Sequence, residues 1–221
     1  MKNTNKKLSK IFTETIERYS NRYRNMKYDV RTLGWGTWEQ QNYRFLQTMY
    51  EKIDFTGKRI LDIGCGFGDY YVFLKNQNIE IGSYIGWDLN PDLIGEARKR
   101  LTPEKNVTFK IRNIFDEEID KDIIADIVVM IGVLNFNLKD TFDNYEYSKS
   151  AIKKAFHHAK EVLIVDFLSE YREDSYPKED FVFYHKPEIM LEYALSLTKD
   201  VFLKHNYMPI PQKEFMLFMY K

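Results

Sequence analysis

The feature that most limits the fold of this chain is an alternation of short apolar runs with helical segments, which begins at residue 59. Nearly continuous apolar strands separated by helices predict a parallel sheet that is covered on both faces. The predicted strands are residues 59–64, 83–88, 107–113, 125–132 and 161–167. The helical segments between them are residues 69–77, 91–101 and 147–160.

The C-terminal part is predicted to add an antiparallel pair of strands. Residues 187–197 have a helical pattern, and two apolar runs, residues 201–210 and 214–220, are joined by the short link 211–213. A parallel crossover needs about a dozen residues or more, so this link cannot make one. The last strand is therefore expected to be antiparallel.

The N-terminal part, about residues 5–55, has a helical pattern that breaks once. Leu8, Ile11 and Ile16 recur at helical spacing, and the break falls in RTLGWGTW. Thr37 is placed to cap a second helix. We predict a helical extension or lid over residues 1–37 and an α/β domain over residues 38–221.

Size, charge and cysteine content restrict the function. A chain of 221 residues suits one α/β domain. Lys+Arg and Asp+Glu both number 33, so the formal net charge is zero, which argues against a nucleic-acid binder that works through charge. No run approaches the roughly 20 apolar residues that span a bilayer. The single cysteine, Cys65, fits a reducing cytoplasm, and the richness in Lys, Asn and Ile indicates a bacterial source.

The first predicted strand continues into the glycine-rich stretch LDIGCGFGD, residues 61–69. In the dinucleotide fingerprint a third glycine stands three residues after the second, and the helix that follows takes a phosphate at its N-terminus. Here Gly64, Gly66 and Gly68 alternate, and Asp69 follows at once, where its charge would repel a pyrophosphate. We therefore predict a nucleoside-like ligand that is not strongly anionic.

Two carboxylates are expected beside this loop. Asp88 ends the second predicted strand, about twenty residues beyond the loop, which is the spacing at which an acid accepts the ribose hydroxyls. Asp62 lies inside the first strand. It is either a structural hydrogen-bonding group or an anchor beneath a cationic ligand group, such as an amino group.

These motifs resemble the class I S-adenosylmethionine-dependent methyltransferases. The resemblance covers about residues 38–221 and rests on LDIGCGFGD, GWDLN with Asp88, FKIRNIFD, DIVVMIGVLNF and the terminal pair of strands. It implies a Rossmann-like α/β fold with a seven-stranded, mostly parallel sheet of order 3-2-1-4-5-7-6, helices on both faces and an antiparallel last strand. It also implies S-adenosyl-L-methionine as the cofactor.

The cofactor contacts are carried over by position. The backbone at Gly64, Cys65 and Gly66 would hold the methionine part, Asp88 the ribose, and Leu89 would pack on the adenine. The adenine edge would meet Asn113, where many family members have Asp, and Ile114, and the sulfonium would be lined by Ile131 or Gly132. Arg44 is a candidate for the methionine carboxylate, through a bidentate pair, or else a solvated helix arginine.

Methyl transfer to a hydroxyl of high pKa needs a general base, whereas an amine needs only its neutral form. Two base candidates stand near the predicted pocket: Asp166, at the end of the fifth strand, and His185, at the end of the connection 168–186. This connection and residues 133–146 both leave from carboxyl ends of strands, where open α/β sheets bind ligands. The alternative role for His185 is a loop-to-helix cap. No metal site is expected.

The predicted function is a cytoplasmic methyltransferase that transfers a methyl group to an O or N atom of a small molecule by in-line displacement. Short insertions favour a small acceptor over a polymer. Two alternatives stay open: an RNA methyltransferase acting on tRNA or rRNA, supported by a basic N-terminal stretch, and a non-catalytic S-adenosylmethionine-binding regulatory protein. The sequence leaves the acceptor and the oligomeric state open, since the N-terminal helices would serve either as a dimer contact or as a lid.

Overall fold

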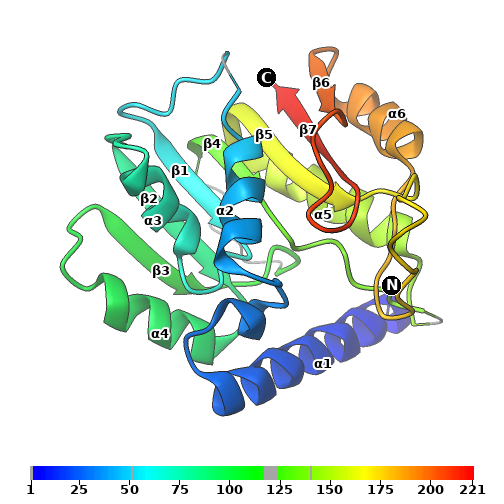
Figure 1. Cartoon of the computed structure of the whole chain (residues 1–221), viewed down its shortest axis with the longest axis horizontal. Helices are drawn as coiled ribbons and strands as arrows, with labels where there is room; N and C mark the ends of the chain where they lie inside the picture. Colours follow the sequence, from blue (N-terminus) through cyan, green and yellow to red (C-terminus); the bar gives the residue numbers. More distant parts are fainter. Residues whose placement is uncertain (1, 51, 117–123, 140) are drawn as a thin grey trace.

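The computed structural model describes residues 2–50, 52–116, 124–139 and 141–221, so residue 140 of the connection 133–146 lies outside the described part. One seven-stranded sheet of order β3-β2-β1-β4-β5-β7-β6 forms the centre (Figure 1), which confirms the predicted fold class and strand order. The strands are β1 Arg59–Ile63, β2 Ser83–Asp88, β3 Val107–Ile111, β4 Ala125–Met130, β5 Ala159–Leu168, β6 Val201–Lys204 and β7 Glu214–Tyr220. The helices are α1 Lys2–Met26, the 3-10 helix η1 Val30–Leu33, α2 Trp38–Gln47, α3 Asp69–Asn76, α4 Pro91–Leu101, α5 Asn144–His158 and α6 Pro187–Leu197.

The strand directions follow the lengths of the connections. β1 to β5 pair in parallel, and each parallel step along the chain contains a long crossover. β7 pairs antiparallel with both β5 and β6, and the short link between the last two strands predicts the second of these pairings.

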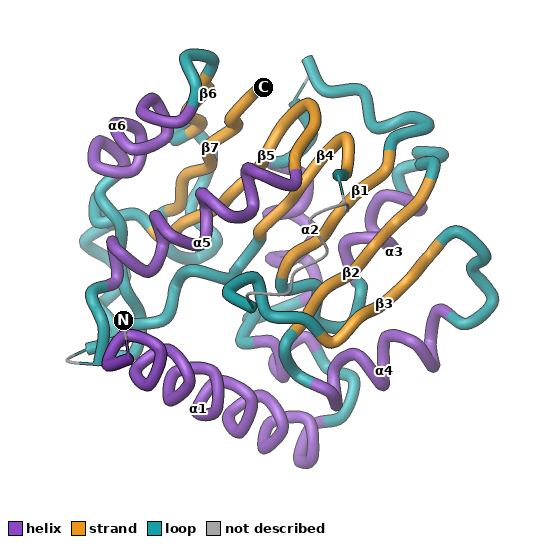
Figure 2. The backbone as a smooth tube through the Cα atoms, turned by 180° about the vertical axis from the view of Figure 1, so that it is seen from behind, coloured by secondary structure: helices purple, strands orange, loops and turns teal. Residues whose placement is uncertain are grey.

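Side chains of the central strands alternate between two apolar layers. Val128 and Met130 of β4 pack in one layer, against α5 and α6, and Ile127 and Val129 pack in the other, against α2, α3 and α4. Figure 2 shows α5 lying across β4 and β5 on one face, with α2 and α3 behind the sheet. The sheet is therefore covered on both faces, and its carboxyl edge is left for the site.

Helix starts follow the capping residues of the sequence. Thr37 Oγ1 accepts from Gln40 N at 3.2 Å while Gln40 Oε1 accepts from Thr37 N at 3.1 Å, which forms a capping box at α2. Asn90 Oδ1 accepts from Asp92 N and Leu93 N at α4. Asp143 Oδ1 accepts from Glu146 N at 2.8 Å, so α5 begins at residue 144 and not at the predicted 147.

Helix α1 lies along the carboxyl edge of the sheet, at the bottom of Figure 1. Asn90, just beyond β2, donates to Ile16 O at 3.0 Å and to Ser20 Oγ at 3.1 Å. Tyr23 OH donates to Glu96 of α4 at 2.7 Å. These bonds hold α1 above the strand ends. None of the helices in the described part of the chain is long and apolar enough to cross a membrane.

Candidate active site

A cavity of about 610 Å³ lies at the carboxyl ends of the parallel strands, between the glycine loop and α1. Every residue that the sequence analysis assigned to the cofactor lines it. They are Arg44, Asp62, Gly64, Cys65, Gly66, Asp88, Leu89, Asn113, Ile114, Ile131 and Gly132. The fold brings these residues to one place, and their contacts with a cofactor remain predictions.

The glycine loop turns back on the end of β2. Gly64 and Gly66 have φ of 82° and 53°, in the left-handed region that glycine adopts at no steric cost. Gly64 N and Cys65 N both donate to Trp87 O, at 2.7 and 3.0 Å. The Cys65 side chain is buried, and burial raises the pKa of its thiol well above the usual value. The thiol is therefore protonated and serves as a packing group.

Asp88 joins the loop to the start of α4. Its Oδ2 accepts from Gly66 N at 3.0 Å and its Oδ1 accepts from Asn90 N at 2.8 Å. A carboxylate oxygen has a second lone pair, so both oxygens keep an acceptor position for a ligand. Burial raises the pKa of Asp88.

Asp62 lies in the floor of the cavity and is 4% exposed. It accepts a hydrogen bond from Tyr84 OH. Burial raises the pKa of Asp62 to about 7, and the nearby carboxylates of Asp88 and Asp69 act in the same direction. A cationic ligand group beside Asp62 would favour its charged form.

The walls beside Asp88 are apolar. Leu89 and the buried side chains of Ile114 and Ile131 line this part of the cavity. Asn113 Oδ1 accepts from Phe115 N at 3.0 Å, which turns the chain after β3 and ends the strand at residue 111. One lone pair of this oxygen remains for a ligand.

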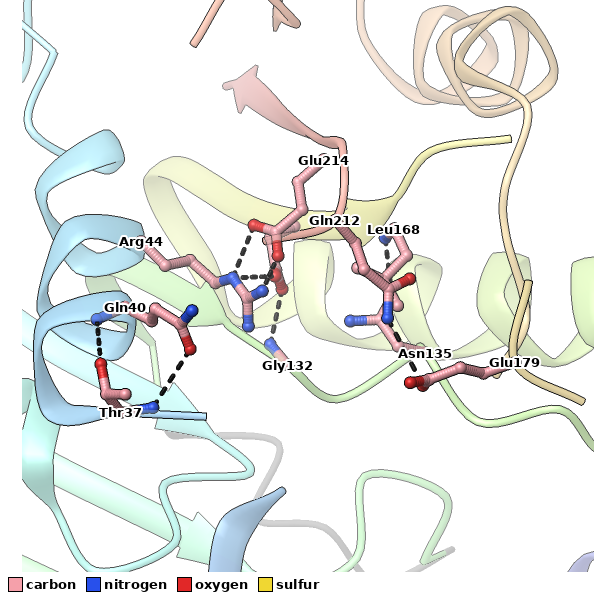
Figure 3. Close-up of polar contacts among 10 residues, drawn as sticks. Thr37, Gln40, Arg44, Gly132, Asn135, Leu168, Glu179, Gln212 and Glu214 are labelled. Atoms are coloured by element: carbon pink, nitrogen blue, oxygen red, sulfur yellow. Dashed lines mark hydrogen bonds and ion pairs between the residues drawn. The ribbon is translucent and has the colours of Figure 1, made fainter. Parts of the chain in front are cut away.

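Arg44 is buried, so the solvated alternative for this arginine is wrong. Its Nε donates to Glu214 Oε2 at 2.6 Å, a second ion pair joins the same two side chains, and Nε lies 3.6 Å from Asp166 Oδ2 (Figure 3). The guanidinium carbon stands 4.0 Å from the ring centroid of Trp35. Two carboxylates thus already hold Arg44, and its contact with the methionine carboxylate stays a prediction.

Neither predicted general base lines the cavity. Asp166 is 1% exposed, and its Oδ1 accepts from Gly132 N at 2.6 Å, so it holds the loop after β4. His185 is fully buried, with Nε2 at 2.9 Å from Ser148 Oγ and the rings of Phe167 and Phe183 beside it. Burial lowers the pKa of His185 to about 3. The structure therefore corrects both assignments: Asp166 is a positioning residue and His185 a core residue.

Two cavity residues, Glu179 and Gln212, were not singled out from the sequence, whereas Tyr176 was expected as either a pocket wall or a packing group and Arg18 as part of the basic N-terminal stretch. Helix α1 brings Arg18, whose guanidinium carbon stands 3.7 Å from the ring centroid of Phe136. The connection after β5 brings Tyr176 and Glu179, and the β6–β7 hairpin brings Gln212. The connection after β5 was the available signal for Glu179, but nothing in the sequence singles out this position within it, or Gln212 within the hairpin link.

Trp35 closes over the loop after β4. A Cβ atom placed on Gly132 would lie 3.0 Å from the Trp35 ring, a contact so close that the ring would have to shift slightly. Gly132 has φ of 74°. In the described part of the chain, no group of three or more His, Cys, Asp or Glu side chains is placed to hold a metal ion.

Residues 61–161, which contain the glycine loop, Asp88, β2 to β4 and parts of β1 and β5, match the family model described as a methyltransferase domain. This stretch of the chain is a methyltransferase domain. In fold, this methyltransferase is similar to the magnesium protoporphyrin IX methyltransferase (ChlM) of Synechocystis PCC 6803, solved with bound SAH. The TM-score is 0.68 at 15% identity over 95% of this chain and 99% of that one.

The chain is also similar to a second solved structure in fold and to a curated protein in sequence. The N-methyltransferase NodS of Bradyrhizobium japonicum WM9, solved with S-adenosyl-l-homocysteine, has a TM-score of 0.62 at 13% identity over 92% of this chain and 98% of that one. A tRNA U34 carboxymethyltransferase of Ectopseudomonas mendocina (strain ymp) is 34% identical over 122 residues, which are 54% of this chain and 37% of that protein. The match thus spans little more than a third of the length of this curated relative.

Proposed function

We propose that the protein transfers a methyl group from S-adenosylmethionine to an O or N atom of a small molecule. The observation that carries the proposal is the single cavity of about 610 Å³ that joins the cofactor residues to the two long connections beneath α1. Small-molecule sites are concave pockets of about 300–1,000 Å³. Because α1 covers the strand ends, a small acceptor fits this site better than a polymer.

The residues present fit the cofactor chemically. Asp88 has two acceptor positions for ribose hydroxyls, and Leu89, Ile114 and Ile131 offer apolar walls to an adenine. Asp62 is a buried carboxyl with no ion pair in the described part of the chain, which suits an amino group. The backbone at Gly64 to Gly66 borders the same space.

S-adenosylmethionine supplies a methyl group that its sulfonium already activates, so the chain has to bind, orient and exclude water. Asp166 holds the Gly132 N–H and so fixes the loop after β4. Trp35 lies against that loop, and both line the cavity. An acceptor amine would enter in its neutral form, and a hydroxyl of ordinary pKa would need a proton acceptor within reach.

The first test is ligand-induced stabilisation. S-adenosylhomocysteine at 100 times its Kd is expected to raise the free energy of unfolding by about 2.7 kcal/mol, while NAD leaves it unchanged. Transfer of radiolabel from methyl-labelled S-adenosylmethionine to a panel of small hydroxyl and amine compounds then tests turnover. Stabilisation by NAD and not by S-adenosylhomocysteine would refute S-adenosylmethionine as the cofactor. Stabilisation by S-adenosylhomocysteine without methyl transfer to any compound would favour a non-catalytic regulatory protein.

A second candidate function is RNA methylation, because the matched relative carries the name tRNA U34 carboxymethyltransferase. The exposed basic side chains of α1 support it: Lys6, Lys7, Lys10 and Arg24. Binding of tRNA that weakens steeply with added salt, with methyl transfer to the RNA, would favour this function. No binding at low salt would exclude it.

A further inference from the structure

One end of the cavity is built by segments from three parts of the chain. Asn135 follows β4, Glu179 lies in the connection after β5, and Gln212 lies in the β6–β7 hairpin (Figure 3). Asn135 ties the first two together, since its Oδ1 accepts from Leu168 N at 2.9 Å and its backbone oxygen accepts from Phe183 N at 3.1 Å. We call this end of the cavity, around Glu179 and Gln212, the methyl-acceptor end.

The Glu179 carboxylate has only weak partners. Its Oε1 accepts from Tyr176 OH at 3.2 Å and its Oε2 accepts from Gln212 Nε2 at 3.4 Å, both at the long end of the hydrogen-bond range. The basic side chains of the same connection point elsewhere, because Arg172 donates to Tyr176 O and Lys178 lies over the Tyr184 ring. Within the described part of the chain, no basic side chain forms an ion pair with Glu179.

The Gln212 side chain presents an unused acceptor. Gln212 is 8% exposed, and its Oε1 is buried without a hydrogen-bond partner among the described residues. The opposite amide orientation would turn Oε1 toward the Glu179 carboxylate, and two acceptors would then face each other. The carboxylate therefore sets the orientation, with Nε2 toward Glu179 and Oε1 free to accept. A buried acceptor without a donor is unfavourable, and a bound ligand that donates a hydrogen bond to it removes that cost.

The remaining walls are largely aromatic and apolar. Phe136, Tyr176 and Phe181 line the cavity, and Ile210 and Pro211 lie beside Gln212. The Glu179 carboxylate and Gln212 Oε1 can thus each accept a hydrogen bond from a ligand. The wall around them suits a ligand with an apolar or aromatic body.

We infer that the methyl acceptor is an aromatic or apolar small molecule that presents an amine or hydroxyl to Glu179 and Gln212, with no anionic group at that end. This inference rests on the proposed function and names its substrate class. Glu179 favours a hydrogen-bond donor, and most strongly a cationic one, because no basic side chain in the described residues pairs with its carboxylate. An amine held there as an ammonium group anchors the molecule, since only a neutral amine can take the methyl group. A carboxylate of the ligand in the same place would be repelled by the carboxylate of Glu179.

The test uses protein saturated with S-adenosylhomocysteine and three matched probe sets, with benzyl, phenethyl and naphthylmethyl bodies. Each body carries an amine, a hydroxyl or a carboxylate, and calorimetry measures each Kd. Amines are expected to bind best, then hydroxyls, with carboxylates weaker than amines by about tenfold or more. Glu179→Gln is expected to remove the amine preference, and Gln212→Met to weaken amines and hydroxyls alike. The Kd for S-adenosylhomocysteine should not change in either variant.

Arg18→Met is the matched control, because it removes the cation that stands over Phe136, leaves the Glu179 carboxylate in place and keeps an apolar stem over the ring. It is expected to leave the amine preference intact. Carboxylates that bind as well as amines, a preference that survives in Glu179→Gln, or no binding by any probe would overturn the inference while the cofactor result stands. Failure of S-adenosylhomocysteine to bind the wild-type protein would instead remove the proposed function and the inference with it.

Discussion

Asp62 couples the charge of the cavity floor to pH. Its folded-state pKa of about 7 lies above the ordinary value of a carboxyl because the side chain is buried. The folded protein therefore binds a proton that the unfolded chain has released. The stability that Asp62 contributes is present at low pH and is lost as pH rises from the ordinary carboxyl range to about 7.

Binding of a cationic amino group should show the opposite dependence. If only the charged form of Asp62 binds, the affinity for S-adenosylhomocysteine rises by about tenfold between about pH 6 and pH 8, as a carboxyl with pKa near 7 ionises. Calorimetry across this range measures the rise, and Asp62→Asn is expected to flatten it. Tyr84→Phe removes the hydrogen bond that favours the charged form and should move the midpoint to higher pH.

The exposed Glu80 offers a control, since Glu80→Gln should follow the wild-type curve. An affinity that does not vary with pH in the wild-type protein would show that Asp62 is a structural group and not the anchor of the amino group.

At the scale of secondary-structure elements, Arg44 joins α2 to the strand pair β5–β7. Glu214 begins β7 and Asp166 lies in β5, next to each other in the sheet. Asp166 also bonds to Gly132, and Trp35 lies under the guanidinium. One arginine thus links the helical N-terminal part, the sheet and the loop after β4.

Arg44→Met is expected to destabilise the protein strongly, because it leaves Asp166 and Glu214 buried without a cation. Breaking a buried ion pair in this way costs about 3–5 kcal/mol. Urea unfolding measures the change. Arg31→Met removes an exposed arginine that pairs with Asp29, and it should change the stability little. If the two substitutions changed the free energy of unfolding equally, the buried ion pairs of Arg44 would contribute no more to stability than an exposed pair.

At the scale of the whole molecule, helix α1 lies between the cavity that holds the predicted cofactor residues and the solvent. Asn90 and Glu96 bind it to the α/β domain by side-chain hydrogen bonds, and its residues Ile11, Thr15, Arg18, Tyr19 and Arg22 line the cavity. A ligand in the cavity would touch both α1 and the glycine loop, and it would hold them together.

S-adenosylhomocysteine is therefore expected to slow amide hydrogen exchange in residues 11–22 and 64–69, since both segments border the cavity. Hydrogen-exchange mass spectrometry with and without the ligand measures this. Helix α6, outside the cavity lining, serves as the internal control and should not change. Slower exchange at the glycine loop with an unchanged α1 would show that α1 is not a lid.

Much of the fold is predictable from local pattern. The order of elements, the antiparallel final strand and the caps Thr37 and Asn90 depend on periodicity and on neighbouring residues. The cofactor residues come together for a related reason, because the carboxyl ends of parallel strands meet at one edge of the sheet. The boundaries were less predictable: β5 extends over Ala159–Leu168, beyond the predicted 161–167, since α5 continues into it without a loop.

The chain's own pattern thus settles the alternation of strands and helices, the glycine loop with Asp88 and the antiparallel final pair of strands, since each depends on contacts within one strand–helix unit or on link length. The sheet order followed from the resemblance to the methyltransferases. The environment of individual side chains depends on the folded molecule. Arg44 meets Glu214 across 170 positions, Gln212 meets Glu179 across 33, and His185 meets Ser148 in the core. No local pattern encodes such pairs, because burial and partner are set by how the strands and connections pack. As a result of this packing, Asp166 and His185 lie outside the cavity lining, whereas Glu179 and Gln212 are part of it.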